Sequence, residues 1–86
     1  MIANQIEARL RAELAPTELQ VRDDSHQHAG HAGAREGGHF HVTVRSERFT
    51  GLQSLARHRL VYHCLADLMK QGIHALAIDA RTPAEP

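Results

Sequence analysis

The sequence predicts a small domain of the α/β (α+β) class with the element order helix, strand, strand, helix, strand, or αββαβ. Apolar side chains recur at helical spacing in two segments and alternate with polar side chains in three short segments. Eighty-six residues leave room for one modest core, and no internal repeat divides the chain. We therefore expect a single domain over residues 1–82, with residues 83–86 as a short, frayed tail.

The first helix is expected over residues 2–15. Its apolar side chains recur every four residues with charged residues between them, and Pro16 stops the helix. This apolar stripe consists of Ile2, Ile6, Leu10 and Leu14. Residues 18–22 then alternate between polar and apolar side chains, which is typical of a short strand with one buried face.

A histidine- and glycine-rich loop is expected over residues 24–38. The stretch DDSHQHAGHAGAREGGHFH, from Asp23 to His41, holds five of the eight histidines of the chain. Phe40, Val42 and Val44 alternate with polar residues at its end, so a second strand begins there. The two strands therefore form a hairpin with a long connection.

The second helix is expected over residues 52–69. Its broad apolar face consists of Leu55, Val61, Tyr62, Leu65, Ala66, Leu68 and Met69. Gly72 is the expected C-cap, and residues 76–79 form the last strand. A helix between the second and third strands implies a crossover, so we expect these strands to run parallel. The result is a three-stranded mixed sheet with both helices on one face.

Composition limits the partners of this chain. Ten Lys+Arg residues balance ten Asp+Glu residues, so no overall positive charge attracts a polyanion. A single cysteine, Cys64, excludes an internal disulfide and an all-cysteine metal site, and we expect it near the polar side of the second helix. We expect neither a signal peptide nor a membrane span, because the first residues contain no apolar h-region and no apolar run is long enough to cross a membrane. We expect a cytoplasmic protein, a monomer or weak homodimer when alone.

The segment RFTGLQSLARHRLVYHCLADL, from Arg48 to Leu68, resembles the signature of the BolA family. The matching positions are Phe49, Gly51, the Arg57-His58-Arg59 triplet, Val61-Tyr62 and Leu65. Three further pieces agree in order and spacing: Asp23-Asp24-Ser25, His39-Phe40 and Ile73-His74-Ala75-Leu76. The resemblance covers residues 2–82. Inside the loop, residues 34–38 depart from the Pro-Gly-Ser-Glu type of run that the family often carries.

The resemblance implies a class II KH-like fold and a role in iron–sulfur assembly, trafficking or iron regulation. BolA-like proteins bind monothiol glutaredoxins and share a [2Fe-2S] cluster with them. By the same resemblance, His74 is the cluster histidine at the start of the last strand, and His28 holds the loop-ligand position, with His31 as the alternative. A [2Fe-2S] cluster needs four ligands, so the glutaredoxin and glutathione would supply two thiolates.

Other interpretations of the histidines stay open. The loop histidines could be solvated, or could chelate Zn²⁺, Ni²⁺ or Cu²⁺ weakly, and His74 could be an ordinary strand-end side chain. His39 and His41 share the strand face opposite Phe40 and could form a polar sheet face or border a docking surface. His58 falls on the apolar side of the second helix, where we expect it to be buried or half-buried.

A second function implied by the resemblance is DNA binding, because bacterial family members are described as transcriptional regulators of morphology and stress genes. A phosphate-contacting patch could be formed by Arg45, Arg48, Arg57, Arg59 and Lys70. We expect Arg57 on the polar side of its helix. The zero net charge, the single tyrosine and the absence of tryptophan argue against strong stacking-based binding. No nucleophile elbow, P-loop or dinucleotide motif is present, so we expect no catalysis.

Overall fold

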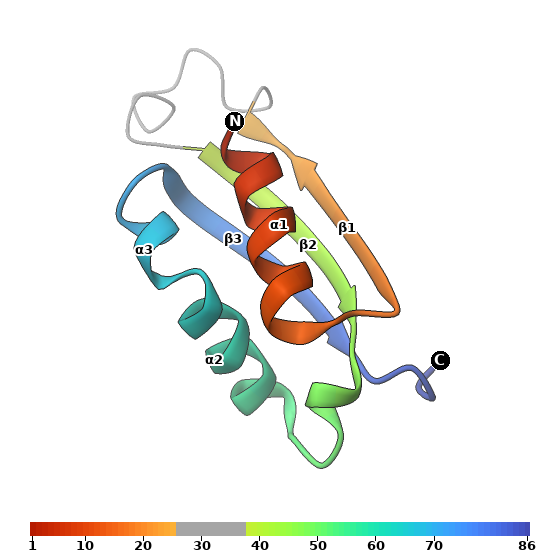
Figure 1. The fold of residues 1–86 in the computed structure, drawn as a ribbon. Helices are drawn as coiled ribbons and strands as arrows, with labels where there is room; N and C mark the ends of the chain where they lie inside the picture. Colours follow the sequence, from red (N-terminus) through yellow and green to blue (C-terminus); the bar gives the residue numbers. More distant parts are fainter. Residues whose placement is uncertain (26–37) are drawn as a thin grey trace.

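A computed structural model describes residues 1–25 and 38–86 and has the predicted order of elements (Figure 1). In chain order the elements are α1 (Ile2–Leu14), β1 (Glu18–Asp23), β2 (Gly38–Arg45), the 3₁₀ turn η3 (Glu47–Phe49), α2 (Ser54–Cys64), α3 (Ala66–Met69) and β3 (Ile73–Arg81). The sheet order is β1-β2-β3, with β1 antiparallel and β3 parallel to β2. The predicted three-stranded mixed sheet is therefore confirmed, including the parallel crossover.

The core lies between the sheet and the helices, which all cover the same sheet face (Figure 1). On β2, Phe40, Val42 and Val44 are buried. The register sets Val42 and Val44 beside apolar residues of both neighbouring strands, and Phe40 beside Leu76 of β3. From α1, Ile6, Leu10 and Leu14 are buried against them. The opposite face of the sheet, the open face, carries no helix among the described residues and consists of the alternate, mostly polar side chains, with Ala75 and Ala77 on β3.

The end of α1 has a local cause. Ala15 adopts a left-handed conformation with φ 43°, and its N–H donates to the carbonyl of Arg11. Such a left-handed residue is a common way to end a helix, and Pro16 follows it. The buried Ser46 hydroxyl then donates to the carbonyl of Leu14 at 2.6 Å and fixes the helix end against the start of η3.

The second predicted helix is divided at Leu65, where the backbone has φ −106° and ψ 13°. Its buried face also differs from the predicted one. Val61, Leu65 and Leu68 are buried as expected, but Leu55 and Tyr62 are 62% and 39% exposed. The expectation that they belong to the core-facing stripe was wrong, because the buried stripe is centred about a third of a turn away from them around the helix.

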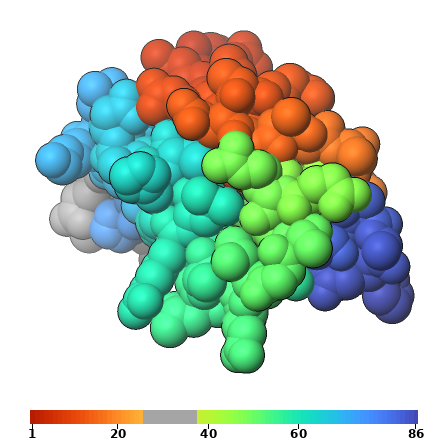
Figure 2. All heavy atoms as spheres, turned by 60° about the horizontal axis from the view of Figure 1, so that its bottom comes forward, coloured from red at the N-terminus to blue at the C-terminus, as the bar shows by residue number. Residues whose placement is uncertain are grey.

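The tail is bonded to the domain and is not frayed. Glu85 forms an ion pair with Arg57, with 2.6 Å between Nη1 and Oε1, and its carboxylate also accepts the N–H of Thr82 at 2.6 Å. The carbonyl of Glu85 accepts a hydrogen bond from Arg45. Figure 2 shows this C-terminal segment, in blue, on the surface beside the green residues that follow β2. The proposed boundary at residue 82 therefore excludes a residue that contacts the fold.

Candidate functional site: a histidine corner at the start of β3

His74 lies in an irregularity of the sheet. Gly38 pairs with Ile73, but His39 pairs with Ala75, so His74 is an extra residue on β3. A bulge of this kind leaves one residue out of the strand pairing and interrupts the regular alternation of side chains between the two faces of the sheet. His74 is solvent-exposed at this position. The imidazole is thus presented at the end of the sheet where β2 begins.

A second imidazole lies against it. The ring centroids of His39 and His74 are 5.1 Å apart, and the ring planes are inclined by 51°. His39 lies on the open face, opposite the buried Phe40, as expected for a polar sheet face. Its contact with His74 was not predicted. The bulge creates that contact, and nothing in the spacing of the sequence encodes a bulge.

Both ends of the histidine-rich loop meet at this corner. The backbone N–H of His39 donates to Ser25 Oγ at 3.0 Å, and the N–H of Asp24 donates to the His39 carbonyl at 2.7 Å. Gly38 donates to the carbonyl of Gly72 at 2.8 Å, which joins the end of the loop to the start of β3. These hydrogen bonds therefore fix both ends of the loop beside the start of β3, where His74 lies.

The predicted loop ligands His28 and His31 lie in residues 26–37, outside the described residues. Among residues 1–25 and 38–86, no group of three or more His, Cys, Asp or Glu side chains could hold a metal ion. Within this range the corner therefore offers two imidazoles.

Asp23, the last residue of β1, and Asp24, the first residue of the loop, hold the backbone at this end of the loop. The Asp24 carboxylate pairs with Arg22 at 2.8 Å, and Asp23 Oδ1 accepts the N–H of Ser25 at 2.8 Å. Their interactions fix the backbone where the loop starts. They thereby position Ser25, and through it the N–H of His39.

A sequence profile of the family described as "BolA-like protein" matches residues 10–85. The chain belongs to the BolA family. Its fold agrees with that of solved BolA domains. It is similar to the BolA domain of SufE1 from Arabidopsis thaliana, with a TM-score of 0.87 and 48% identity over 98% of this chain and 94% of that domain. It is also similar to BolA1 from Arabidopsis thaliana, with a TM-score of 0.86 and 44% identity over the same shares of both chains.

Two curated relatives extend the comparison. The chain is 44% identical to "Protein BOLA1, chloroplastic" of Arabidopsis thaliana over 96% of this chain, but spans only 54% of that relative. It is 42% identical to the "DNA-binding transcriptional regulator BolA" of Escherichia coli (strain K12), covering 99% of this chain and 79% of the relative. The chain thus spans about half the length of the first of these. No helix of the described residues has the length and apolar character needed to cross a membrane.

The five basic residues of the predicted nucleic-acid patch do not gather in one place. Arg45 is at the end of β2, beside Arg81, whereas Lys70 precedes the start of β3 at the other end of the sheet. Arg45 pairs with Glu18 at 3.2 Å, and Arg48 donates to the carbonyl of Glu13 at 3.4 Å. Lys70 therefore lies apart from Arg45 and Arg57, which both bind Glu85.

We expected Arg57 on the polar side of its helix, but the structure places it elsewhere. Its side chain is 14% exposed and donates to the carbonyls of Leu52 and Ala80 at 2.8 and 3.1 Å, besides pairing with Glu85. The guanidinium thus joins the loop before α2, strand β3 and the tail. Within the described residues, the exposed side chains of Arg59 and Lys70 make no hydrogen bond or ion pair, so these two cations are the ones available to a partner.

Cys64 was expected near the polar side of the helix, but it is 8% exposed and lies within the core. Burial raises the pKa of its thiol. The end of α2 is a part of the domain other than the histidine corner, so this cysteine does not provide a thiolate there. His58 is half-buried, as expected.

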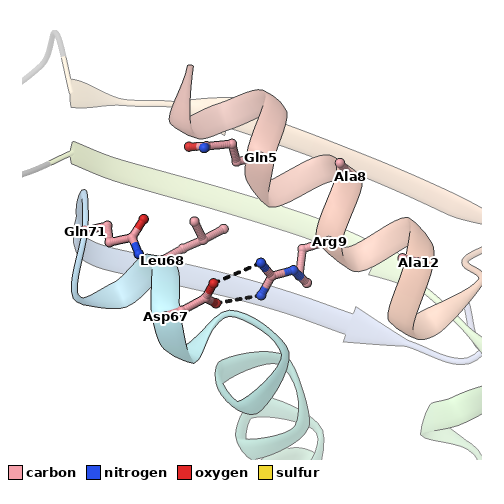
Figure 3. A pocket seen from close by; sticks show the side chains of 7 residues that line it. All are labelled: Gln5, Ala8, Arg9, Ala12, Asp67, Leu68 and Gln71. Carbon is pink, nitrogen blue, oxygen red and sulfur yellow. Dashed lines mark hydrogen bonds and ion pairs between the residues drawn. The ribbon is translucent and has the colours of Figure 1, made fainter.

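A shallow groove between α1 and α3, of about 340 Å³, was not predicted (Figure 3). Its lining consists of Gln5, Ala8, Arg9, Ala12, Asp67, Leu68 and Gln71. Arg9 donates two hydrogen bonds to the Asp67 carboxylate, at 2.6 and 2.9 Å, and these bonds hold the pKa of Asp67 below its usual value. The ion pair spans the groove and joins the two helices, which indicates a structural role.

Proposed function

We propose that this chain is an adaptor that binds a monothiol glutaredoxin and shares a [2Fe-2S] cluster with it. The observation that carries the proposal is the contact between the imidazoles of His39 and His74, at the corner where the histidine-rich loop begins and ends. Family membership supports it. The cluster is cargo in this account, serving iron–sulfur assembly, trafficking or iron regulation.

The donor set suits half of such a site. A [2Fe-2S] cluster takes four ligands, and two imidazoles can replace two thiolates on one iron, which raises the reduction potential. The corner offers imidazoles, while the buried Cys64 lies elsewhere. The two thiolates would then come from the glutaredoxin and from glutathione.

His74 is the first proposed ligand, and His28 is the second, with His31 as its alternative. His39 adds a third possibility, because its ring already contacts His74. If a loop histidine is the second ligand, His39 acts instead as a positioning residue that limits the rotation of the His74 ring. Substitution can separate these roles.

The test is anaerobic cluster reconstitution of the chain with a monothiol glutaredoxin and glutathione, followed by absorption and circular dichroism spectra. We expect a heterodimer spectrum that differs from that of the glutaredoxin alone, is lost in His74→Ala and is lost in only one of His28→Ala, His31→Ala and His39→Ala. His41→Ala, on the same sheet face as His39, is the matched control. A spectrum that is the same with and without this chain contradicts the proposal.

The second candidate function is DNA binding, supported by the name of the Escherichia coli relative, which covers nearly all of this chain. Of the predicted patch, Arg59 and Lys70 are the residues that would contact the phosphates. Phosphate contacts make affinity depend on salt, with a slope that decreases by about one for each contact removed. Arg59→Ala and Lys70→Ala should each reduce the slope, whereas Arg57→Ala should destabilise the fold instead. Binding of duplex DNA that shows no salt dependence contradicts this function.

A further inference from the structure

Helix α2 carries exposed apolar side chains outside its buried face. Its buried side includes Val61 and Cys64, whereas Leu55 and Tyr62 are exposed. Leu55, Arg59 and Tyr62 are spaced at i, i+4 and i+7, so they lie on one side of the helix. We call these three residues the α2 outer face. An exposed leucine is common by itself, but here it shares a helical face with a half-exposed tyrosine and an arginine.

The α2 outer face runs beside the outer edge of β3. Tyr62 Oη donates to the carbonyl of Leu76 at 3.2 Å, and Arg57 Nη1 donates to the carbonyl of Ala80 at 3.1 Å. The start of α2 is therefore near the end of β3, and the two elements run antiparallel (Figure 1). These bonds also occupy carbonyls at the free edge of the sheet, where another strand could otherwise pair.

The same edge leads to the histidine corner. Leu76, which accepts the Tyr62 hydrogen bond, is two residues after His74, or about 7 Å along the strand. From Leu55 to Tyr62 the helix rises about 10 Å. A standard protein–protein interface buries about 800 Å² on each partner, which is enough for one partner to cover the surface from Leu55 to His74. A protein that supplies ligands beside His74 can cover both at once.

Charge indicates the chemistry of the partner. The Arg59 guanidinium makes no ion pair within the part of the chain that the structure describes, while Asp67 is already held by Arg9. The outer face therefore presents an uncompensated positive charge between two apolar side chains. The complementary surface has an apolar pocket beside a carboxylate.

The open face of the sheet is the competing surface, and its charges are internally paired. Arg22 pairs with Asp24, Arg45 with Glu18, and Arg81 with Asp79. Each of these pairs is neutral overall, so they leave little net charge for a partner to recognise. Among the described residues, the exposed large apolar side chains are Met1, Leu55 and Tyr62, and none of these is on that face.

We propose that the α2 outer face is the docking surface for the cluster-sharing glutaredoxin, which meets it with an apolar pocket and an acidic side chain. This inference rests on the proposed function and assigns the partner to one side of the histidine corner. A nucleic acid fits the same face less well. Phosphates gain nothing from the Leu55 side chain, and Arg59 is the single cation among the three residues of this face.

The test measures the anaerobic dissociation constant of the chain for a monothiol glutaredoxin with glutathione, by calorimetry. Leu55→Glu should weaken binding about tenfold or more, and Arg59→Ala should weaken it severalfold. Gln20→Glu introduces the same charge on the open face and is the matched control. Thermal unfolding confirms that each variant folds, and Leu55→Ser tests the apolar contact without an added charge.

Each outcome is decisive. Weaker binding by the Leu55 and Arg59 variants, with Gln20→Glu unchanged, supports the docking surface. If the unchanged chain binds the glutaredoxin and the two Leu55 variants bind equally well, the docking surface is wrong and the proposed function stands. Weakening by Gln20→Glu places the partner on the open face and overturns the inference. If the unchanged chain does not bind at all, the proposed function fails and this inference fails with it.

Discussion

Arg57 and Glu85 form an ion pair at 2.6 Å between a guanidinium on α2 and a carboxylate in the C-terminal tail. Arg57 is part of the Arg57-His58-Arg59 triplet that carries the family resemblance. Its hydrogen bonds to Leu52, Ala80 and Glu85 show that one basic residue of the triplet stabilises the fold, whereas Arg59 points outward. The triplet therefore combines a structural and a surface residue.

Arg57→Ala should lower the free energy of unfolding by about 2–4 kcal/mol, because hydrogen bonds from a charged donor are lost and the carbonyl partners remain. Urea denaturation measures this change. Arg59→Ala is the matched control, and as an exposed substitution it should change stability by no more than about 0.5 kcal/mol. Equal stabilities of the two variants would mean that the Arg57 bonds contribute nothing.

Glu85 should make the domain sensitive to acid. The hydrogen bond from Arg57 lowers the pKa of Glu85 from 4.5 to about 2. A lowered pKa in the folded state stabilises the fold while the carboxylate is charged, so this contribution is present above pH 4.5 and is lost as the pH falls toward 2. Glu85→Gln should flatten the stability profile in that window. In an Arg57→Ala background the same substitution should have little further effect, and a full effect there would refute the assignment to Arg57.

The Cys64 thiol should react slowly in the folded protein. It is buried, and burial raises its pKa, so little thiolate is present and access is limited. A thiol-specific disulfide reagent at mildly alkaline pH should label it slowly in native buffer and rapidly in guanidinium. Rapid labelling of the native protein would show that the end of α2 opens readily.

Gly38→Ala should disturb the histidine corner through the core. A Cβ at this position would lie 2.5 Å from Phe40 Cε2 and 2.8 Å from Cζ, and this ring is buried. We expect a loss of about 1–3 kcal/mol and shifted NMR signals of His39 and His74. Gly51→Ala is the control, because no atom lies within 4 Å there and only its φ of 82° opposes a side chain. Unchanged histidine signals in Gly38→Ala would show that the geometry of the histidine corner does not depend on the packing of Phe40.

The sequence predicts the parts of the fold that depend on local periodicity. The spacing in α1, the alternation in the strands and the crossover were enough to predict the sheet and its parallel pair. The buried stripe of α2 was misplaced because Tyr62 was counted as apolar and Cys64 as polar, while the fold buries Cys64 and leaves Tyr62 at the edge of β3. Tertiary packing decided between two helical faces that are similarly apolar.

The candidate site was predicted only in part, for a similar reason. His74 followed from the family resemblance, and the structure places it at an exposed corner. Its contact with His39 depends on a bulge between two strands that are far apart in the sequence, and the anchoring of Glu85 depends on the distant Arg57. The first contact depends on the register of the sheet and the second on the packing of the tail against α2, and residue spacing alone determines neither.

The most direct test of the shared cluster uses nitrogen hyperfine couplings. The chain is labelled with ¹⁵N-histidine, combined with unlabelled monothiol glutaredoxin, glutathione and a [2Fe-2S] cluster, and reduced for pulsed electron paramagnetic resonance. We predict ¹⁵N couplings of directly bound imidazole, which disappear or change in His74→Ala and persist in His41→Ala. A cluster whose spectrum contains no ¹⁵N coupling from this chain would contradict the account.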